Sequence, residues 1–127
     1  MKFLLDTYAL IEWYAQGNQN YAPYFKLDVE RHITKTTLLE FYCQIYHNLG
    51  EKKAETYYSY ITAYAEITEL TEDIIKSAAV FRSKMMKKKK KLSYGDCINY
   101  ITACKIGAKF VTGDKEFEEL ENVEFVR

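Results

Sequence analysis

Four carboxylates are the side chains best suited to chemistry: Asp6, Glu40, Asp96 and Asp114. Most of them stand among apolar or aromatic residues, where desolvation and mutual repulsion both disfavour the charged form. A hard divalent cation removes that cost, and carboxylate oxygens suit Mg²⁺ or Mn²⁺. Such a site binds phosphate oxygens and lowers the pKa of a water molecule, so the reaction it favours is phosphodiester hydrolysis.

Helix capping is the competing interpretation of the same four acids. Asp6 and Asp114 each follow a predicted strand and open a helix, as N-caps do. The segments 37–40 and 93–96 both fit the capping-box pattern. Capping is the simpler explanation for each acid alone, but it does not explain the apolar setting.

The elements that must position these acids alternate between strands and helices. Short apolar runs predict strands at 2–5, 32–35, 67–70, 109–112 and 123–126. Helical spacing predicts helices at 7–16, 38–49, 51–64, 71–86, 93–107 and 115–120, with a further short helix near Tyr24. We therefore expect one α/β domain over residues 1–127, with a mainly parallel sheet of about five strands between two layers of helices. Acidic residues at the carboxyl ends of such strands are where ligands bind.

Composition excludes several classes of protein. The 127 residues carry 18 basic and 18 acidic side chains, so total charge indicates no nucleic-acid partner. No apolar run is long enough to span a membrane or to act as a secretory signal, and we expect a cytoplasmic protein. With 2 histidines and no C-x-x-C pair, a zinc site is disfavoured, and Cys43, Cys97 and Cys104 are expected to be reduced thiols in the core.

Four segments resemble, in order, the acidic motifs of the PIN-domain ribonucleases. They are FLLDT at 3–7, TTLLE at 36–40, LSYGD at 92–96 and VTGDKEF at 111–117. The chain looks most similar to the small VapC-like toxins. This resemblance implies a PIN-like three-layer α/β/α fold and a Mg²⁺- or Mn²⁺-dependent endoribonuclease that cleaves single-stranded or structured RNA. It also implies a homodimer and a cognate antitoxin that inserts into the acidic groove.

Carried over by position, the resemblance makes Asp6, Glu40, Asp96 and Asp114 the catalytic, metal-binding acids. Asp6 and Asp96 are then the expected direct ligands. Thr7 and Thr112 stand beside the acids and are expected to support them by hydrogen bonding; an ordinary role at strand ends is equally compatible. Glu116 stands where some family members carry a further aspartate, and it is a weaker candidate for the same role, as is Asn99.

Basic and aromatic side chains gather in two further segments. An unbroken lysine run comprises Lys87, Lys88, Lys89, Lys90 and Lys91. It stands just before Asp96 and is predicted to contact the RNA backbone, although a solvated helix end is the commoner meaning of such runs. The helix at 51–64 carries Tyr57, Tyr58, Tyr60 and Tyr64, which favours packing or a dimer surface over base stacking. Trp13 is expected in the core.

Three other classes of protein are alternatives to the nuclease, and two of them require sequence features that this chain lacks. The principal one is a non-catalytic PIN-fold RNA-binding module, which would keep the lysine run and lose one or more acids. A receiver domain requires paired acids after the first strand, where this chain has Asp6 followed by Thr7. A dinucleotide-binding domain requires a G-x-G-x-x-G fingerprint, which is absent.

Overall fold

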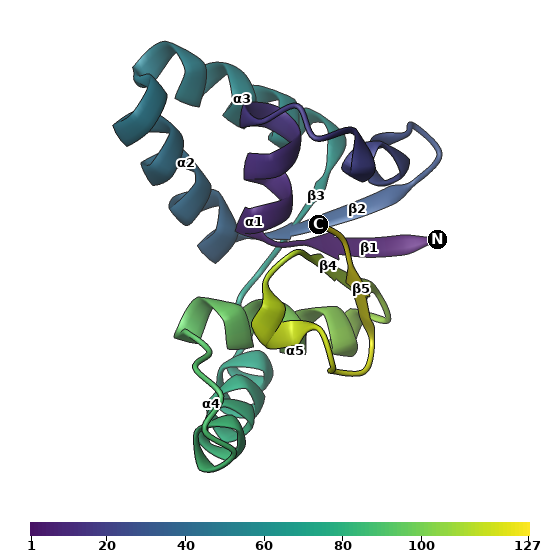
Figure 1. Cartoon of the computed structure of the whole chain (residues 1–127), viewed down its shortest axis with the longest axis vertical. Helices are drawn as coiled ribbons and strands as arrows, with labels where there is room; N and C mark the ends of the chain where they lie inside the picture. Colours follow the sequence, from purple (N-terminus) through teal and green to yellow (C-terminus); the bar gives the residue numbers. More distant parts are fainter.

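Five short strands form one sheet in which every neighbouring pair is parallel. The computed structural model describes residues 1–127 and is shown in Figure 1. The order across the sheet is β3-β2-β1-β4-β5. The bounds are β1 Lys2–Leu5, β2 Glu30–Thr34, β3 Glu66–Thr68, β4 Lys109–Thr112 and β5 Val123–Phe125. The predicted α/β fold with its parallel five-stranded sheet is confirmed.

Helices cover both faces of the sheet, giving three layers (Figure 1). One face carries α1 (Thr7–Leu10), the π-helical turn η1 (Ile11–Ala15), α2 (Lys35–Leu49) and α3 (Glu51–Tyr64). The other carries α4 (Glu72–Lys87) and α5 (Tyr94–Ile106). Two 3-10 segments, η2 (Gln19–Phe25) and η3 (Lys115–Phe117), complete the chain. No helix is long and apolar enough to cross a membrane.

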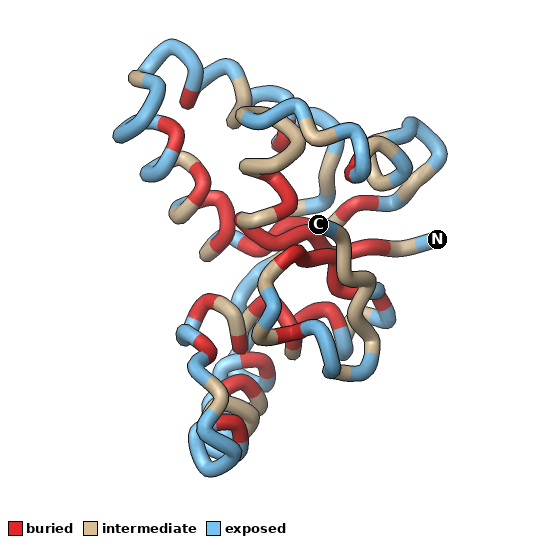
Figure 2. The backbone as a smooth tube through the Cα atoms, in the orientation of Figure 1, coloured by how far each residue is buried: buried red, intermediate tan, exposed pale blue.

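Alternation along β1 divides the core between the two helical layers. Phe3 and Leu5 belong to the apolar cluster under α1, α2 and α3, whereas Leu4 belongs to the cluster under α4 and α5. Successive side chains of a strand point to opposite faces, so a central strand must be apolar throughout. Figure 2 accordingly shows continuous burial along the middle of the sheet.

The strand order reverses at β1, which lies between β2 and β4. The chain crosses first to one side of β1, through β2 and β3, and later to the other side, through β4 and β5. In open parallel sheets this reversal leaves a crevice at the carboxyl ends of the central strands. Asp6 directly follows β1 and Asp114 follows β4, so the fold brings both acids to that crevice.

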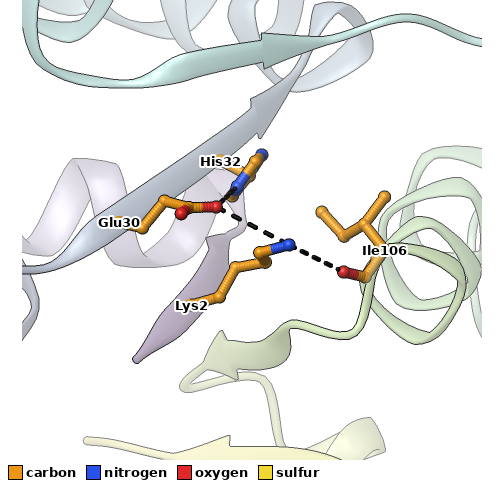
Figure 3. A network of polar contacts seen from close by, with 4 residues as sticks. All are labelled: Lys2, Glu30, His32 and Ile106. Carbon is orange, nitrogen blue, oxygen red and sulfur yellow. Dashed lines mark hydrogen bonds and ion pairs between the residues drawn. The ribbon is translucent and has the colours of Figure 1, made fainter.

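The amino-terminal end of the sheet is joined to α5 by a separate polar network (Figure 3). The Lys2 ammonium donates to the carbonyl oxygen of Ile106 at 3.1 Å and lies 3.7 Å from a carboxylate oxygen of Glu30. The His32 ring nitrogen lies 2.6 Å from the same oxygen. Lys2 therefore provides a positive charge at the C-terminal end of α5, where the helix dipole favours one.

Several local predictions are wrong. The predicted capping box at 37–40 does not form, because Thr34 is the N-cap of α2 and its side chain accepts from the backbone N–H of Thr37. On α4, Ile75 and Ala79 face solvent instead of the core, because the helix buries only the stripe containing Ile74, Ala78 and Met85.

The cysteine and tryptophan expectations also need correction. Only Cys97 is buried, whereas Cys43 and Cys104 lie on exposed helix faces. Trp13 is half-buried, and its ring stacks on Phe25 with 4.7 Å between ring centroids. An apolar sequence context therefore did not specify which side of these helices faces the sheet.

Candidate active site

The four predicted acids line one cavity of about 260 Å³ at the carboxyl edge of the sheet. It is lined by residues of α1, η1, α2 and α5 and by the acids that follow β1 and β4. Figure 1 shows how the sheet brings these elements together. The lining residues are Asp6, Thr7, Tyr8, Ile11, Glu12, Glu40, Gln44, Asp96, Asn99 and Asp114. Residues separated by more than a hundred positions in the chain are thus brought together.

Asp6 is the most buried of the acids, with 6% of its surface exposed. One carboxylate oxygen accepts from the backbone N–H of Ala9 at 2.9 Å, and the other accepts from the Thr112 hydroxyl at 2.5 Å. Burial raises the pKa of Asp6 to about 7, and the nearby charges of Asp96 and Asp114 add to the rise. Hydrogen bonds from Thr112 and Ala9 oppose the shift without cancelling it.

Asp96 combines a capping contact with a carboxylate oxygen that makes no hydrogen bond within the protein. It is the third residue of the α5 capping box: its carboxylate accepts from the backbone N–H of Ser93 at 2.9 Å, and the Ser93 hydroxyl accepts from the N–H of Asp96 at 3.0 Å. Only one carboxylate oxygen is used, so the other is free to bind a ligand. Burial raises the pKa of Asp96, and the charges of Asp114 and Glu116 raise it further.

Asp114 is fixed by the turn that follows β4. Its carboxylate accepts from the backbone N–H of Glu116, and its own N–H donates to the Thr112 hydroxyl, both at 3.0 Å. Gly113 makes this turn possible, because an added Cβ would lie 2.2 Å from the Tyr8 ring and 2.5 Å from the carbonyl oxygen of Val126. Thr112 therefore joins Asp6 to the Asp114 turn.

Glu40 projects from the second turn of α2 toward α5. The Thr7 hydroxyl donates to its carboxylate at 3.2 Å. On the other side, an added Cβ at Gly95 would lie 2.4 Å from Glu40 Oε1, so the absence of a side chain there makes room for the carboxylate. Burial raises the pKa of Glu40, and the charge of Asp96 acts in the same direction.

Asn99 connects the two helical layers beneath the cavity. This residue is 3% exposed, and its carbonyl oxygen accepts from the hydroxyls of Thr34 at 2.6 Å and Thr37 at 3.1 Å. Its amide donates back to Thr37 at 2.9 Å. Buried polar groups that are satisfied by each other fix side-chain positions. The network therefore sets how α5 and Asp96 face α2 and Glu40.

Other predicted site residues lie outside the cavity lining. Glu116 contributes a backbone N–H to Asp114, and its negative charge raises the pKa of Asp96. The lysine run Lys87–Lys91 occupies the C-terminal end of α4 and the following turn, at the lower tip of the molecule in Figure 1. None of these lysines lines the acidic cavity.

Sequence reasoning missed the outer part of the cavity, formed by Tyr8, Ile11, Glu12 and Gln44. A signal was available in the helical spacing. Residues four apart lie on one face of a helix, so Gln44 follows Glu40 on α2, and Glu12 follows Tyr8 along α1 and η1.

The donor set fits a hard divalent cation. All the candidate ligands are carboxylate or neutral oxygens, and a positive ion would offset the burial and the mutual repulsion that together raise the pKa values of Asp6 and Asp96. No three acidic, histidine or cysteine side chains converge closely enough to enclose an ion by themselves. This arrangement suits Mg²⁺, which is commonly held by one or two carboxylates with water in the remaining positions.

The fold and the cavity together define a three-layer α/β protein with an acidic centre at the point where its strand order reverses. The sequence matches the family model of the PIN domain over residues 3–123, and the chain belongs to this family.

Solved structures share the whole fold. A chain of the VapBC2 complex from Rickettsia felis, bound to a promoter DNA fragment, has a TM-score of 0.84 and 15% identity over 100% of both chains. VapC20 of Mycobacterium tuberculosis, a toxin that cleaves the sarcin-ricin loop, has a TM-score of 0.81 and 13% identity over 98% of this chain and 99% of that one. A chain of the DNA-bound VapBC complex from Salmonella typhimurium has a TM-score of 0.83 and 19% identity, over 98% of this chain and 96% of that one. The fold is thus that of the VapC-like toxins.

No curated protein sequence matches the chain.

Proposed function

We propose that this protein is a metal-dependent endoribonuclease and the toxin of a toxin-antitoxin pair. The observation that carries the proposal is the convergence of four acids from four segments on one cavity, with Asp6 buried deeply enough to raise its pKa to about 7. Capping accounts for the backbone contacts of Asp6, Asp96 and Asp114. It does not account for the placement of Glu40, which caps no helix.

The reaction is hydrolysis of an RNA phosphodiester, in which a water oxygen forms a bond to phosphorus, one P–O bond of the backbone breaks, and the departing ribose oxygen takes up a proton to become a hydroxyl. A bound Mg²⁺ or Mn²⁺ ion supplies positive charge for the phosphate and acidifies the attacking water. Asp6 and Asp96 are the proposed ligands, and Thr112 holds the Asp6 carboxylate in place. Glu40 and Asp114 orient water and accept its proton, and Thr7 positions Glu40.

The antitoxin partner is supported by the similarity to VapBC toxin-antitoxin complexes. The toxin is proposed to act in the cytoplasm, where its RNA substrates are. A homodimer remains part of the proposal. Tyr60 and Tyr64 of α3 are 51% and 58% exposed, so this helix retains aromatic surface that a second protein surface can cover.

Cleavage of a labelled RNA pool tests the proposal. The purified protein is expected to cut RNA in Mg²⁺ or Mn²⁺ and to stop when EDTA is added. Asp96→Asn is expected to reduce the rate about a thousandfold or more, because one anionic ligand is lost. The asparagine oxygen can still accept a hydrogen bond from the backbone N–H of Ser93, so the α5 cap should form and the melting temperature should be unchanged.

The matched control is Asp28→Asn, because Asp28 is exposed and lies outside the cavity. It is expected to cut like the unmodified protein. A folded protein that binds RNA but cuts none in either metal would support the non-catalytic RNA-binding module. Full activity in Asp96→Asn would contradict the site assignment.

The lysine run is proposed to contact the RNA backbone. Replacing Lys87–Lys91 with glutamine is expected to weaken RNA binding and to flatten its salt dependence, by up to about 3 units in the slope of log K against log salt. Binding of the inactive Asp96→Asn protein to single-stranded RNA across a salt series measures this slope. The control is a variant in which Lys52 and Lys53 on α3 are replaced with glutamine. An unchanged slope would assign the run to a solvated helix end.

A further inference from the structure

The outer part of the acidic cavity carries polar groups that the proposed hydrolysis does not use. Tyr8 and Glu12 project from α1 and η1, and Gln44 projects from α2 on the facing wall. Tyr8 directly follows Thr7, which contacts Glu40. A group bound against this outer wall would therefore be adjacent to a phosphate at the acids.

Glu12 is held in position by Asn18. The Asn18 amide donates to Glu12 Oε1 at 3.0 Å, and the backbone N–H of Asn18 donates to the carbonyl oxygen of Glu12 at 2.8 Å. The Asn18 side-chain oxygen accepts from the N–H of Asn20 at 3.0 Å, which fixes the orientation of the amide. These contacts surround the π-helical turn, a feature often found at functional sites.

The free hydrogen-bonding groups of this wall define what it can recognise. No protein group donates to Glu12 Oε2, and the Gln44 side chain has no partner within the protein. A carboxylate only accepts hydrogen bonds, so a ligand that hydrogen-bonds to Glu12 must offer N–H or O–H donors; Gln44 offers both donors and an acceptor.

Among the RNA bases, guanine alone presents two adjacent N–H donors, N1–H and the N2 amino group, with the O6 acceptor beside them. A carboxylate accepts such a pair of donors side by side. We propose that Glu12 and Gln44 form a guanine-binding subsite next to the scissile phosphate, with Glu12 accepting from N1–H and N2–H and Gln44 donating to O6.

Tyr8 completes this subsite as the surface on which the base stacks. Its ring is half-buried, with one edge close to Gly113, and the Arg127 guanidinium lies over the ring at 5.9 Å from its centroid. Bases of single-stranded RNA stack on aromatic rings, while hydrogen bonds to the base edge provide the sequence preference. The subsite deepens the proposed ribonuclease function and rests on it for its biological role.

Binding of three nucleotides tests the subsite independently of cleavage. The probes are guanosine, inosine and adenosine 5′-monophosphates, measured by NMR titration with Mg²⁺ present. The phosphate is common to all three, so differences report the base. Inosine lacks only the N2 amino group, and we expect it to bind about tenfold more weakly than guanosine monophosphate, with adenosine monophosphate weaker still. Equal affinities, or no binding of the guanine nucleotide, would overturn the proposal.

Glu12→Gln tests the assignment of the residue. Glutamine keeps an acceptor for Asn18, so the fold should persist, which a melting curve checks. The variant is expected to lose the preference for the guanine nucleotide over the inosine nucleotide. The control Glu72→Gln lies on the exposed start of α4 and should keep the preference. A purely structural role for Glu12 would lower stability and leave the preference intact.

Cut-site mapping separates this proposal from the ribonuclease proposal. The subsite would be supported if the unmodified protein cuts RNA next to guanine and the Glu12→Gln variant cuts next to other bases as well. Cuts with no guanine preference would contradict the subsite alone. Absence of all cleavage would contradict the nuclease, while the nucleotide titrations would still decide whether guanine binds.

Discussion

Replacing Asp6 with asparagine is expected to stabilise the metal-free protein above neutral pH while reducing RNA cleavage about a thousandfold or more. The two effects have one cause. Asp6 is buried beside other carboxylates, so its charge is unfavourable without a cation. Asparagine removes that charge and keeps an oxygen for the N–H of Ala9, but it removes a negatively charged metal ligand.

The sign of the pH dependence follows from the raised pKa. In the unfolded chain Asp6 titrates near 3.8, and in the folded protein near 7. The folded state therefore holds this proton more tightly. Its contribution to stability is fully present below about pH 4 and is lost as the pH rises through about 7, with an upper limit of about 4 kcal/mol. The raised pKa values of Glu40 and Asp96 act in the same direction.

Denaturant unfolding in EDTA from pH 4 to pH 8 measures this effect. The unmodified protein should lose stability over the interval, and Asp6→Asn should lose less. Added Mg²⁺ should recover stability at pH 8 in the unmodified protein more than in the variant. A variant that is less stable than the unmodified protein at pH 8 in EDTA would show that Asp6 is primarily a structural cap.

Replacing Gly113 with alanine is expected to lower stability by about 3 kcal/mol or more. The added Cβ would lie 2.2 Å from the Tyr8 ring and 2.5 Å from the Val126 carbonyl oxygen. The ring can rotate away, but the backbone oxygen belongs to Val126, which directly follows β5 and whose N–H donates to the Thr112 carbonyl oxygen of β4. Relief therefore requires movement of the turn that carries Asp114, and cleavage should fall with stability.

Thermal melting checks this prediction, with a decrease of roughly 10 °C expected. Tyr8→Ala provides the comparison, because it removes the ring and leaves the Val126 contact. The double variant should recover part of the loss caused by Gly113→Ala and not all of it. A Gly113→Ala protein that melts at the original temperature would show that the turn is not closely packed.

Much of the fold was predictable because strand and helix signals are local. The strand 2–5, the helix 51–64 and the strand 109–112 have the same bounds in the sequence and in the structure. Gly107 ends α5 in the left-handed conformation, with φ +72°, as its position after a helical run predicts. The start of α2 was misplaced, because Thr34, Thr36 and Thr37 are chemically similar and only tertiary contacts choose the cap.

The candidate site was predictable only in part. Acids that follow strands are visible in the sequence, since a parallel sheet gathers strand ends at one edge. The roles of Gly95 and Gly113 are not visible, because the groups they make room for, Glu40 and Tyr8, are far away in the chain. Asn99 was underrated for the same reason: its partners Thr34 and Thr37 lie more than sixty positions earlier.

The central position of β1 determines when during synthesis the cavity is completed. This first strand pairs with β2, which follows it in the chain, and with β4, which is translated only after α5. A nascent chain without β4 leaves one edge of β1 unpaired and lacks both the Thr112 hydroxyl and the Asp114 carboxylate. The full set of acids therefore assembles only after residues 109–114 have left the ribosome, and a chain that terminates before them has an incomplete cavity.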